Sequence, residues 1–371
     1  MIHSTICKVT QKAFRLRFVE VSLLNSAQSV YNTSMNIIPI FVPHEGCRTQ
    51  CIFCNEYSAT GVTGVPDEKE IISTVEKYLS FFRHPEDVEL AFYGGTFTGF
   101  GNQQKYLEVA TEFFKAGQIK GIRFSTSPGL ISERLVEYLK PYPVNFIELG
   151  VQSFDDTVLE KSNRDHNTSD VYKATHLLNS NGIKFGIHLM TGLPEDSESK
   201  DIHSTREAIR VGASSVRLHP LVILKGSLLE NEYKLRRFSP LDLQESIEIL
   251  WKMYLLLSTS NVKINRIGIC LYGKQIDNVV AGPFHPAIGE LVRDRLFLEI
   301  VRAFSGEMKR NELRLHNKFK PFFTGHKKGI VEEARKEGIL IDFAHDGEEI
   351  DVSLYMRRIK ERVLEGVYAE A

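Results

Sequence analysis

Short apolar segments alternate along the chain with segments whose apolar residues recur every three or four positions. The first pattern is typical of buried strands and the second of amphipathic helices. Between residues 68 and 82, for example, Ile71, Val75, Tyr78 and Leu79 fall on one helical face. The apolar segments predict strands over residues 37–42, 88–93, 121–125, 145–151, 184–189 and 215–224. The periodic segments predict helices over residues 68–82, 103–116, 130–139, 166–181, 197–211 and 240–258.

A strand followed by a helix, six times over, is the pattern of a parallel sheet built from βαβ units. We therefore predict the α/β class, with a partial (β/α)6 TIM-like barrel over residues 35–295. Functional residues in such barrels lie on the loops at the carboxyl ends of the strands. The alternation stops after about Val292, and we expect a small C-terminal α+β domain over residues 296–371. Its expected elements are a helix near 328–336, a strand at 339–343 and a helix at 353–365.

Residues 1–34 are predicted to form an N-terminal extension before the barrel. Four basic residues against one acidic residue, with several Ser and Thr, faintly resemble an organellar targeting segment. An ordinary extension, or a true start at Met35, explains the same composition, and we favour that interpretation.

The composition excludes several classes of protein. The 371 residues carry 46 Lys and Arg against 47 Asp and Glu, so no net field attracts nucleic acid or an acidic membrane. No apolar run reaches the ~18 residues that a membrane-spanning helix needs, and we expect no membrane partner. Five cysteines are too few for a disulfide framework, and Cys7 and Cys270 stand alone. These features together predict a cytoplasmic protein.

The remaining cysteines, Cys47, Cys51 and Cys54, follow the first predicted strand with the spacing Cys-x3-Cys-x2-Cys. Three thiolates can hold three irons of a [4Fe–4S] cluster, whereas ordinary ferredoxin clusters use four cysteines. The fourth iron would then be open to a small molecule, as open metal positions are elsewhere. Structural zinc with His44 as the fourth ligand is an alternative, although zinc sites normally consist of paired Cys-x2-Cys units.

This cysteine loop after a first barrel strand resembles the radical S-adenosylmethionine (SAM) superfamily. The resemblance implies that the three cysteines hold a [4Fe–4S] cluster whose open iron binds SAM. It also implies that Phe53, the aromatic residue before the last cysteine, packs beside the adenine. Reductive cleavage of SAM would yield a 5′-deoxyadenosyl radical, with flavodoxin or ferredoxin as the low-potential electron donor. The cofactor carries that chemistry, and the protein supplies position and electron access.

Two further segments at strand ends are similar to cofactor-binding motifs of that superfamily. Gly94, Gly95 and Thr96 follow the second strand, where their carbonyls would accept hydrogen bonds from the cofactor's ammonium. Gln152 ends the fourth strand, and Arg164 beyond it offers a bidentate fork for the cofactor's carboxylate. An ordinary turn and a solvated arginine are the alternatives for the two segments.

The fifth strand contributes His188 and Gly192 to the predicted cofactor site. His188 alternates with apolar neighbours and should point into the barrel, where a catalytic group and a hydrogen-bonded core histidine are equally open interpretations. Gly192 would let the backbone approach the adenine.

Within the superfamily, residues 187–194, 221–227 and 282–290 resemble the radical domain of the catalytic subunit of Elongator, a tRNA uridine-modifying complex. This implies tRNA modification as a possible activity. The chain leaves no room for Elongator's acetyltransferase domain, has no second cysteine group for its zinc, and reads Ser-Thr-Ser-Pro-Gly at 125–129 instead of Ser-Thr-Arg-Pro-Asp. We therefore expect a stand-alone bacterial branch with a substrate of its own. A coproporphyrinogen oxidase-like enzyme, which would typically have Asp in place of His188, and a non-catalytic iron–sulfur electron-transfer or sensor protein are the alternatives.

Residues 309–328 hold seven basic side chains against one acid, with Phe319, Phe322 and Phe323 among them. Such a stretch could stack bases and neutralise phosphates, which would make RNA a partner. The alternative is a solvated loop whose charge is offset by the acids of residues 332–351.

Overall fold

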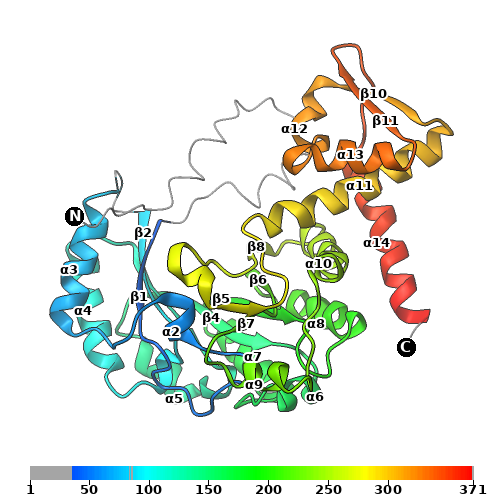
Figure 1. Ribbon diagram of the computed structural model, residues 1–371. Coiled ribbons are helices and arrows are strands. Elements are labelled where there is room, and N and C mark those ends of the chain that lie inside the picture. Colours follow the sequence, from blue (N-terminus) through cyan, green and yellow to red (C-terminus); the bar gives the residue numbers. More distant parts are fainter. Residues whose placement is uncertain (1–35, 83, 85–86, 370–371) are drawn as a thin grey trace.

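The computed structural model describes residues 36–82, 84 and 87–369, so the predicted extension over 1–34 lies outside the described residues. Seven parallel strands form one sheet in the order β1-β2-β3-β4-β5-β6-β8, which curls into a half-barrel with helices outside it (Figure 1). The predicted α/β class and partial barrel are confirmed, with seven strands in place of the expected six. The strands are β1 (Asn36–Phe41), β2 (Val88–Tyr93), β3 (Gly121–Thr126), β4 (Val144–Gln152), β5 (Lys184–Thr191), β6 (Ser215–Pro220) and β8 (Lys263–Ile267).

The main helices around the sheet start at side chains that cap their first turn. Asp67, Asn167 and Asp242 each accept a backbone hydrogen bond and form a capping box with the residue three positions on. The helices of the barrel are α2 (Glu56–Thr60), α3 (Glu68–Leu79), α4 (Gln103–Lys115), α5 (Glu133–Leu139), α6 (Asp156–Lys161), α7 (Thr168–Ser180), α8 (Glu198–Arg210), α9 (Leu228–Lys234) and α10 (Leu243–Ser258).

Side chains along each strand alternate between the helix-covered face and the inside of the half-barrel. On β5, Phe185, Ile187 and Leu189 are buried in the main hydrophobic core. Burial of each such side chain contributes about 1.5–3 kcal/mol. His188, between them, faces inward and contacts Glu148 of β4. The outer face therefore stabilises the fold, and the inner face is left for polar groups.

Two parts of the sheet differ from the prediction. The strand expected over 215–224 ends at Pro220, and β7 (Ile223–Leu224) pairs with β9 (Val279–Ala281) in a separate antiparallel sheet. Strand β8, which completes the half-barrel beside β6, was not predicted. A 3₁₀ segment, η4 (Gly273–Asn278), follows it and leads into β9.

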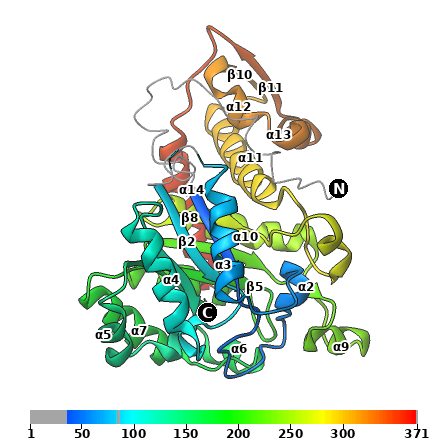
Figure 2. The ribbon, with the colours of Figure 1, turned by 90° about the vertical axis from the view of Figure 1, so that its left-hand side faces the viewer.

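The C-terminal part is built on a long helix, α11 (Ile288–Met308), which runs through the expected domain boundary at 295–296. The division into two domains stays a prediction. Beyond α11, β10 (Glu312–His316) and β11 (Leu340–Ala344) pair in parallel, and α12 (Lys320–Phe323) and α13 (Gly329–Lys336) lie between them in the chain. Figure 2 shows this unit at the far end of α11 from the barrel.

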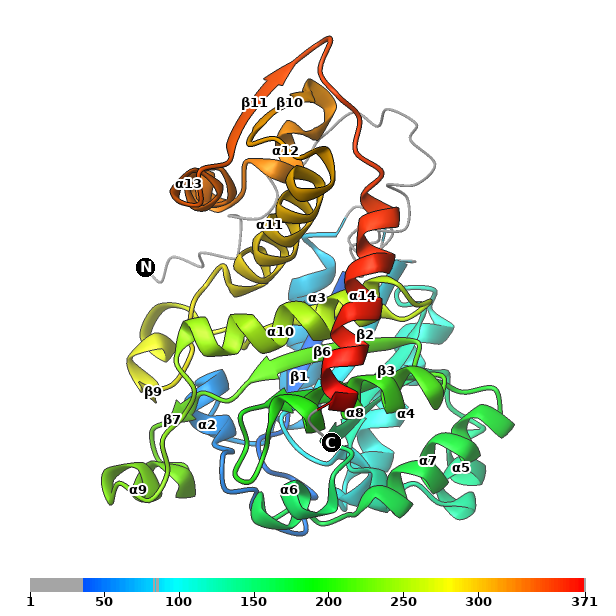
Figure 3. The same cartoon turned by 90° about the vertical axis from the view of Figure 1, so that its right-hand side faces the viewer.

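The last helix, α14 (Val352–Ala369), returns from that unit to pack on α10 and α11 (Figure 3). Its buried residues include Tyr355, Met356 and Ile359. No helix within the described ranges is both long and apolar enough to span a bilayer.

Candidate active site at the carboxyl ends of the strands

The cysteine loop continues the pairing of β1 with β2 beyond both strands. The Val42 N–H donates to the Tyr93 carbonyl, and the His44 N–H donates to the Gly94 carbonyl, each at 2.8 Å. The Thr96 N–H then donates back to the Glu45 carbonyl, also at 2.8 Å. The predicted cysteine and Gly-Gly-Thr segments therefore lie side by side at the carboxyl ends of two neighbouring strands.

Two glycines allow this close approach. A Cβ atom on Gly95 would lie 2.5 Å from the Glu45 carbonyl oxygen, and one on Gly46 would lie 2.2 Å from the Thr96 carbonyl oxygen. Gly46 also has a φ of 73°, which other residues adopt only with strain. Both loops thus need glycine where their backbones touch.

The three thiols each contact a different polar group. Cys47 Sγ lies 3.3 Å from Thr96 Oγ1, and Cys54 Sγ lies 3.8 Å from Glu56 Oε1. Cys51 Sγ accepts a hydrogen bond from Arg164 Nη1 at 2.7 Å. Burial raises the pKa of Cys47 and raises that of Cys54 further, and the nearby thiols add to both effects.

The donor set fits an iron–sulfur cluster better than a single ion. No three His, Cys, Asp or Glu side chains within the described residues converge to hold one metal ion. A [4Fe–4S] cluster bonds each thiolate to a different iron, so its thiols need not meet at one point. His44, the proposed fourth zinc ligand, instead accepts the Glu56 N–H at 3.0 Å through Nε2. The structure therefore gives the zinc alternative no support.

Arg164 is held against the cysteine loop by its own turn. Asn163 donates to the Gln50 carbonyl at 2.7 Å and accepts from Thr49 Oγ1 at 3.0 Å through its own carbonyl. The guanidinium then donates to Cys51 and, through Nη2, to the Gly150 carbonyl at 2.6 Å. Its Nε is buried and has no partner within the described residues. Arg164 thus lies beside Cys51 with one N–H that has no partner in the described part of the chain, and its role toward a cofactor carboxylate stays a prediction.

The other predicted cofactor residues lie around the same strand ends. Gln152 has a φ of 70° beside an irregularity in the β4–β5 pairing, a feature common next to active sites. Phe53 and Met190 both pack against a small apolar cluster that includes Leu193, just beyond β5. The side of Gly192 where a Cβ would lie is occupied by Leu241, 3.0 Å away. On that side, the Leu241 side chain leaves no space for an adenine next to the Gly192 backbone.

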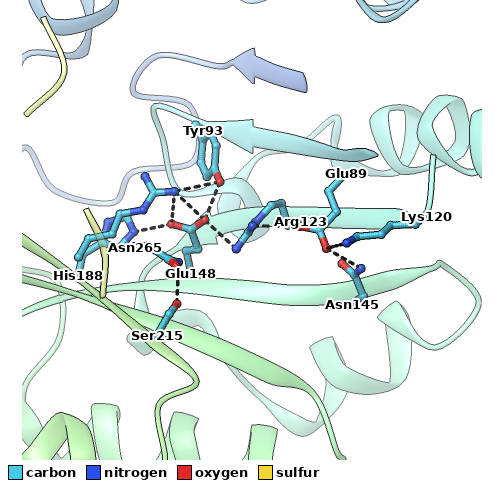
Figure 4. Close-up of polar contacts among 10 residues, drawn as sticks. Glu89, Tyr93, Lys120, Arg123, Asn145, Glu148, His188, Ser215 and Asn265 are labelled. Atoms are coloured by element: carbon cyan, nitrogen blue, oxygen red, sulfur yellow. Dashed lines mark hydrogen bonds and ion pairs between the residues drawn. The ribbon is translucent and has the colours of Figure 1, made fainter. Parts of the chain in front are cut away.

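A buried network of charged side chains fills the inside of the half-barrel below this site. Figure 4 shows Glu148 between Tyr93, Arg123 and His188. Glu148 accepts from Tyr93 Oη and His188 Nε2, each at 2.6 Å. Arg123 lies 3.1 Å from it and Arg217 3.0 Å from it. Arg123 also contacts Glu89 at 3.0 Å, and Lys120 lies 3.9 Å from Glu89 at the edge of the network.

The network fixes the protonation state of its members. Burial alone would raise the pKa of Glu148, but Arg217, His188 and Arg123 hold that pKa well below its ordinary value. Burial lowers the pKa of His188 despite its contact with Glu148. An ionised carboxylate can only accept, so the neutral His188 ring carries its proton on Nε2. Burial and Glu148 raise the pKa of Tyr93, which therefore stays a neutral donor.

Sequence patterns predicted the inward direction of His188 and missed its partners. Arg123 and Glu148 each interrupt an otherwise apolar strand, and a charge at such a position was the available signal. Arg217, the third of the six residues of β6, gave the same signal, whereas Tyr93 gave none because it is the last residue of β2.

The basic stretch over 309–328 is not the predicted stacking surface. Phe319 and Phe323 are buried, and Phe322 packs on Phe297 with 6.1 Å between the ring centres. Three of the basic residues are paired with the acids of the following loop: Arg310 with Glu348, Arg314 with Asp346 and Lys318 with Glu349. The prediction that these phenylalanines stack bases was wrong, because β10 and α12 turn them into the core.

A curled parallel sheet with three cysteines on the loop after its first strand defines a class of enzyme. The chain belongs to the radical SAM superfamily: the profile of that superfamily matches residues 41–207, and that of the radical SAM C-terminal domain matches residues 213–297. Enzymes of this superfamily use a [4Fe–4S] cluster and SAM.

Among its relatives, a tRNA uridine(34) acetyltransferase of Dehalococcoides mccartyi is 27% identical over 230 residues, which cover 52% of this chain and 50% of the relative. Protein YhcC of Escherichia coli is 24% identical over 207 residues, 53% of this chain and 64% of the relative. The structure of archaeal Elp3 from Methanocaldococcus infernus has the same fold, with a TM-score of 0.57, 20% identity, and coverage of 77% of this chain and 66% of that one. This chain thus spans from half to about two thirds of these relatives.

Proposed function

We propose that Cys47, Cys51 and Cys54 hold the [4Fe–4S] cluster, that SAM binds beside them, and that the substrate is an RNA of the tRNA class. The observation that supports the cofactor site most strongly is the contact of Arg164 with both the Cys51 thiol and the Gly150 carbonyl. It places a cation with an unused buried N–H next to the cysteines.

Different residues of this chain would bind different parts of SAM. The Gly94 carbonyl already accepts from His44 and retains a second lone pair for the ammonium of SAM. Arg164 would pair with the carboxylate through its free Nε. Phe53 would cover the adenine from the apolar cluster at the end of β5. When bound, the cluster and SAM supply a 5′-deoxyadenosyl radical by reductive cleavage.

The Glu148 network would form the floor of the site. His188 and Arg217 retain 18% and 21% of their side-chain exposure, so both reach the inner space. Because Glu148 neutralises Arg217, this floor offers hydrogen bonds without a net charge. The proposed RNA substrate draws support from relatives that are named as tRNA uridine(34) acetyltransferases.

The test is anaerobic reconstitution with iron and sulfide, followed by SAM and dithionite, with 5′-deoxyadenosine measured with and without bulk tRNA. We expect about four irons per chain and 5′-deoxyadenosine release that tRNA stimulates. Cys51→Ser should lose the cluster, whereas Cys270→Ser, at an exposed cysteine outside the Cys-x3-Cys-x2-Cys segment, should keep it. A full cluster without 5′-deoxyadenosine in either tube would contradict the proposal. Flavodoxin or ferredoxin should replace dithionite as the electron donor.

A further inference from the structure

Exposed apolar and aromatic side chains gather at one place on the molecule, beside the cysteine loop. Half of the twelve large ones that are exposed within the described residues lie in three short segments. These segments are α2, the α9 region and the segment around η4. The six residues are Tyr57, Leu228, Tyr233, Leu235, Tyr272 and Ile276, with exposures from 36% to 63%.

The three segments are bound to one another, so they form one surface. Asn55 Nδ2 and Ser58 Oγ both donate to the Lys225 carbonyl, at 2.9 and 2.8 Å. Gln275 Nε2 of η4 donates to the Thr60 carbonyl of α2 at 2.7 Å. Because β1 and β8 are the two edges of the sheet, this contact joins the two edges at their carboxyl ends. We call the surface of α2, α9 and η4 the rim surface; Figures 2 and 3 show α2 and α9 on the same side of the molecule.

Two hollows in the rim surface each combine a tyrosine with arginine. The first, of about 430 Å³, is lined by Cys47, Arg48, Tyr57 and Gly226 among others. The second, of about 330 Å³, is lined by Tyr233, Arg236, Arg237, Phe238 and Ser239. An aromatic ring beside a guanidinium suits a stacked base with its phosphate.

The spacing of the hollows suits a single strand of nucleic acid. Gly226 of the first hollow and Tyr233 of the second are separated by the length of α9, about 10 Å for seven helical residues. Bases stacked at about 3.4 Å cover that distance in roughly three nucleotides.

Unpaired cations outnumber unpaired acids on the rim surface. Arg48, Lys225, Arg236 and Lys274 are exposed, and no ion pair involves them within the described ranges. Glu45, Glu56 and Asp277 are the three acids without an ion pair there within the described ranges, against these four cations, while Glu230 and Glu232 are paired with Lys234 and Arg237. The local field is therefore positive although the whole chain carries a charge of −1.

We infer that the rim surface binds an unpaired RNA loop, with bases stacked on Tyr57 and Tyr233 and phosphates on the neighbouring arginines. This rests on the proposed function, and it assigns the RNA to a surface whose first hollow includes Cys47. Stacking on tyrosine is tolerant of sequence, whereas the single-stranded form is required, because bases in a duplex are not free to stack on protein.

The test measures filter retention of bulk tRNA by the reconstituted full chain between 50 and 200 mM KCl. Tyr233→Ala with Arg236→Glu should weaken binding about tenfold to a hundredfold and lower the salt slope by about one or two. Tyr233→Phe keeps the ring and should bind within twofold of wild type. Phe114→Ala with Lys105→Glu on α4, exposed residues on the other side of the barrel, is the matched control and should also bind as wild type (Figure 2).

The outcomes separate this inference from the proposed function. If wild type binds no tRNA, the RNA substrate itself is refuted. If wild type binds and the Tyr233/Arg236 variant binds equally well, the rim surface is refuted while the RNA substrate stands. Equal losses in the rim and α4 variants would also overturn the inference, since they indicate binding by overall charge. If tRNA binding is intact but reduction by flavodoxin is slowed, the rim surface docks the electron donor instead.

Discussion

Gly95 lies where the cysteine loop and the loop after β2 touch, and its replacement tests that contact. A Cβ there would meet three backbone atoms of Val42 and Glu45 between 2.5 and 2.9 Å, and backbone cannot rotate away as a side chain can. We expect Gly95→Ala to destabilise the protein by about 1–3 kcal/mol and to lower the iron content after reconstitution. Gly101→Ala, which has nothing within 4 Å of its added Cβ, is the control. Full iron loading of the Gly95 variant would contradict the close contact.

Glu148 is the residue on which the buried network depends. Glu148→Gln keeps the shape of the side chain and leaves Arg123 and Arg217 with an uncompensated charge. We expect a loss of about 3–5 kcal/mol in the free energy of unfolding, measured in urea at pH 7. Glu112→Gln, which breaks an exposed pair with Lys115, should cost less than about 1 kcal/mol.

Wild type and Glu148→Gln should also differ in how their free energies of unfolding depend on pH, and the pKa of Glu148 sets the sign of that difference. The folded-state pKa of Glu148 lies below its ordinary value of 4.5, so its contribution to stability is present above that pH and is lost as the pH falls. The difference between wild type and Glu148→Gln should therefore shrink below pH 4.5, by about 1 kcal/mol per pH unit. A difference that stays constant down to pH 3 would show that the carboxylate is not held ionised by its neighbours.

The two groups of site residues differ in how far the sequence could predict them. Cys47, Cys51 and Cys54 are neighbours in the chain, so their spacing alone indicates an iron–sulfur site. Glu148 and its partners come from five strands. The sequence of a single strand does not determine which other strands will lie next to it. His188 could be assigned to the inner face by alternation, but its hydrogen bond to Glu148 depends on the β4–β5 register.

At the scale of elements, the strands that were predicted are those with long apolar runs. Strand β8 was missed because Lys263, Asn265 and Arg266 leave it two apolar residues, and it lies at the sheet edge. Strand β10 was taken for a basic loop, although Leu313 and Leu315 alternate with charged residues and are buried. In both strands, polar side chains that face solvent or the polar interior outnumber the apolar ones, so the alternation of apolar and polar residues is hard to recognise in the sequence.

Helix α14 connects the C-terminal unit back to the barrel, and one buried side chain tests this role. Ile359 is 2% exposed in the main core, where α14 packs on α10 and α11. Ile359→Ala should lower the free energy of unfolding by about 2–4 kcal/mol, measured by urea denaturation of the full chain. Arg357→Ala, an exposed change two residues away, should have an effect within about 0.5 kcal/mol. Equal effects of the two changes would mean that α14 is not anchored in the core.

At the scale of the whole molecule, β10 and β11 lie beyond α11 from the barrel (Figure 1), whereas η6 (His326–Lys328) turns back to the start of that helix, where His326 pairs with Glu290. The barrel carries the cysteine loop and the rim surface with its two hollows. The cations of the C-terminal unit are partly neutralised by Asp346, Glu348 and Glu349.

Lys327 and Lys328 test whether the C-terminal unit takes part in RNA binding, because both are exposed and neither joins an ion pair within the described residues. We expect Lys327→Glu with Lys328→Glu to change tRNA affinity less than threefold at 150 mM KCl, since neither lysine belongs to the rim surface and salt screens the effect of a charge beyond about 8 Å. The measurement is the same filter retention, run beside the Tyr233/Arg236 variant. A loss of tenfold or more from the two lysines alone would move the RNA contact to the C-terminal unit. That result would restore the basic stretch over 309–328 as a phosphate-binding surface, with no role for its buried phenylalanines.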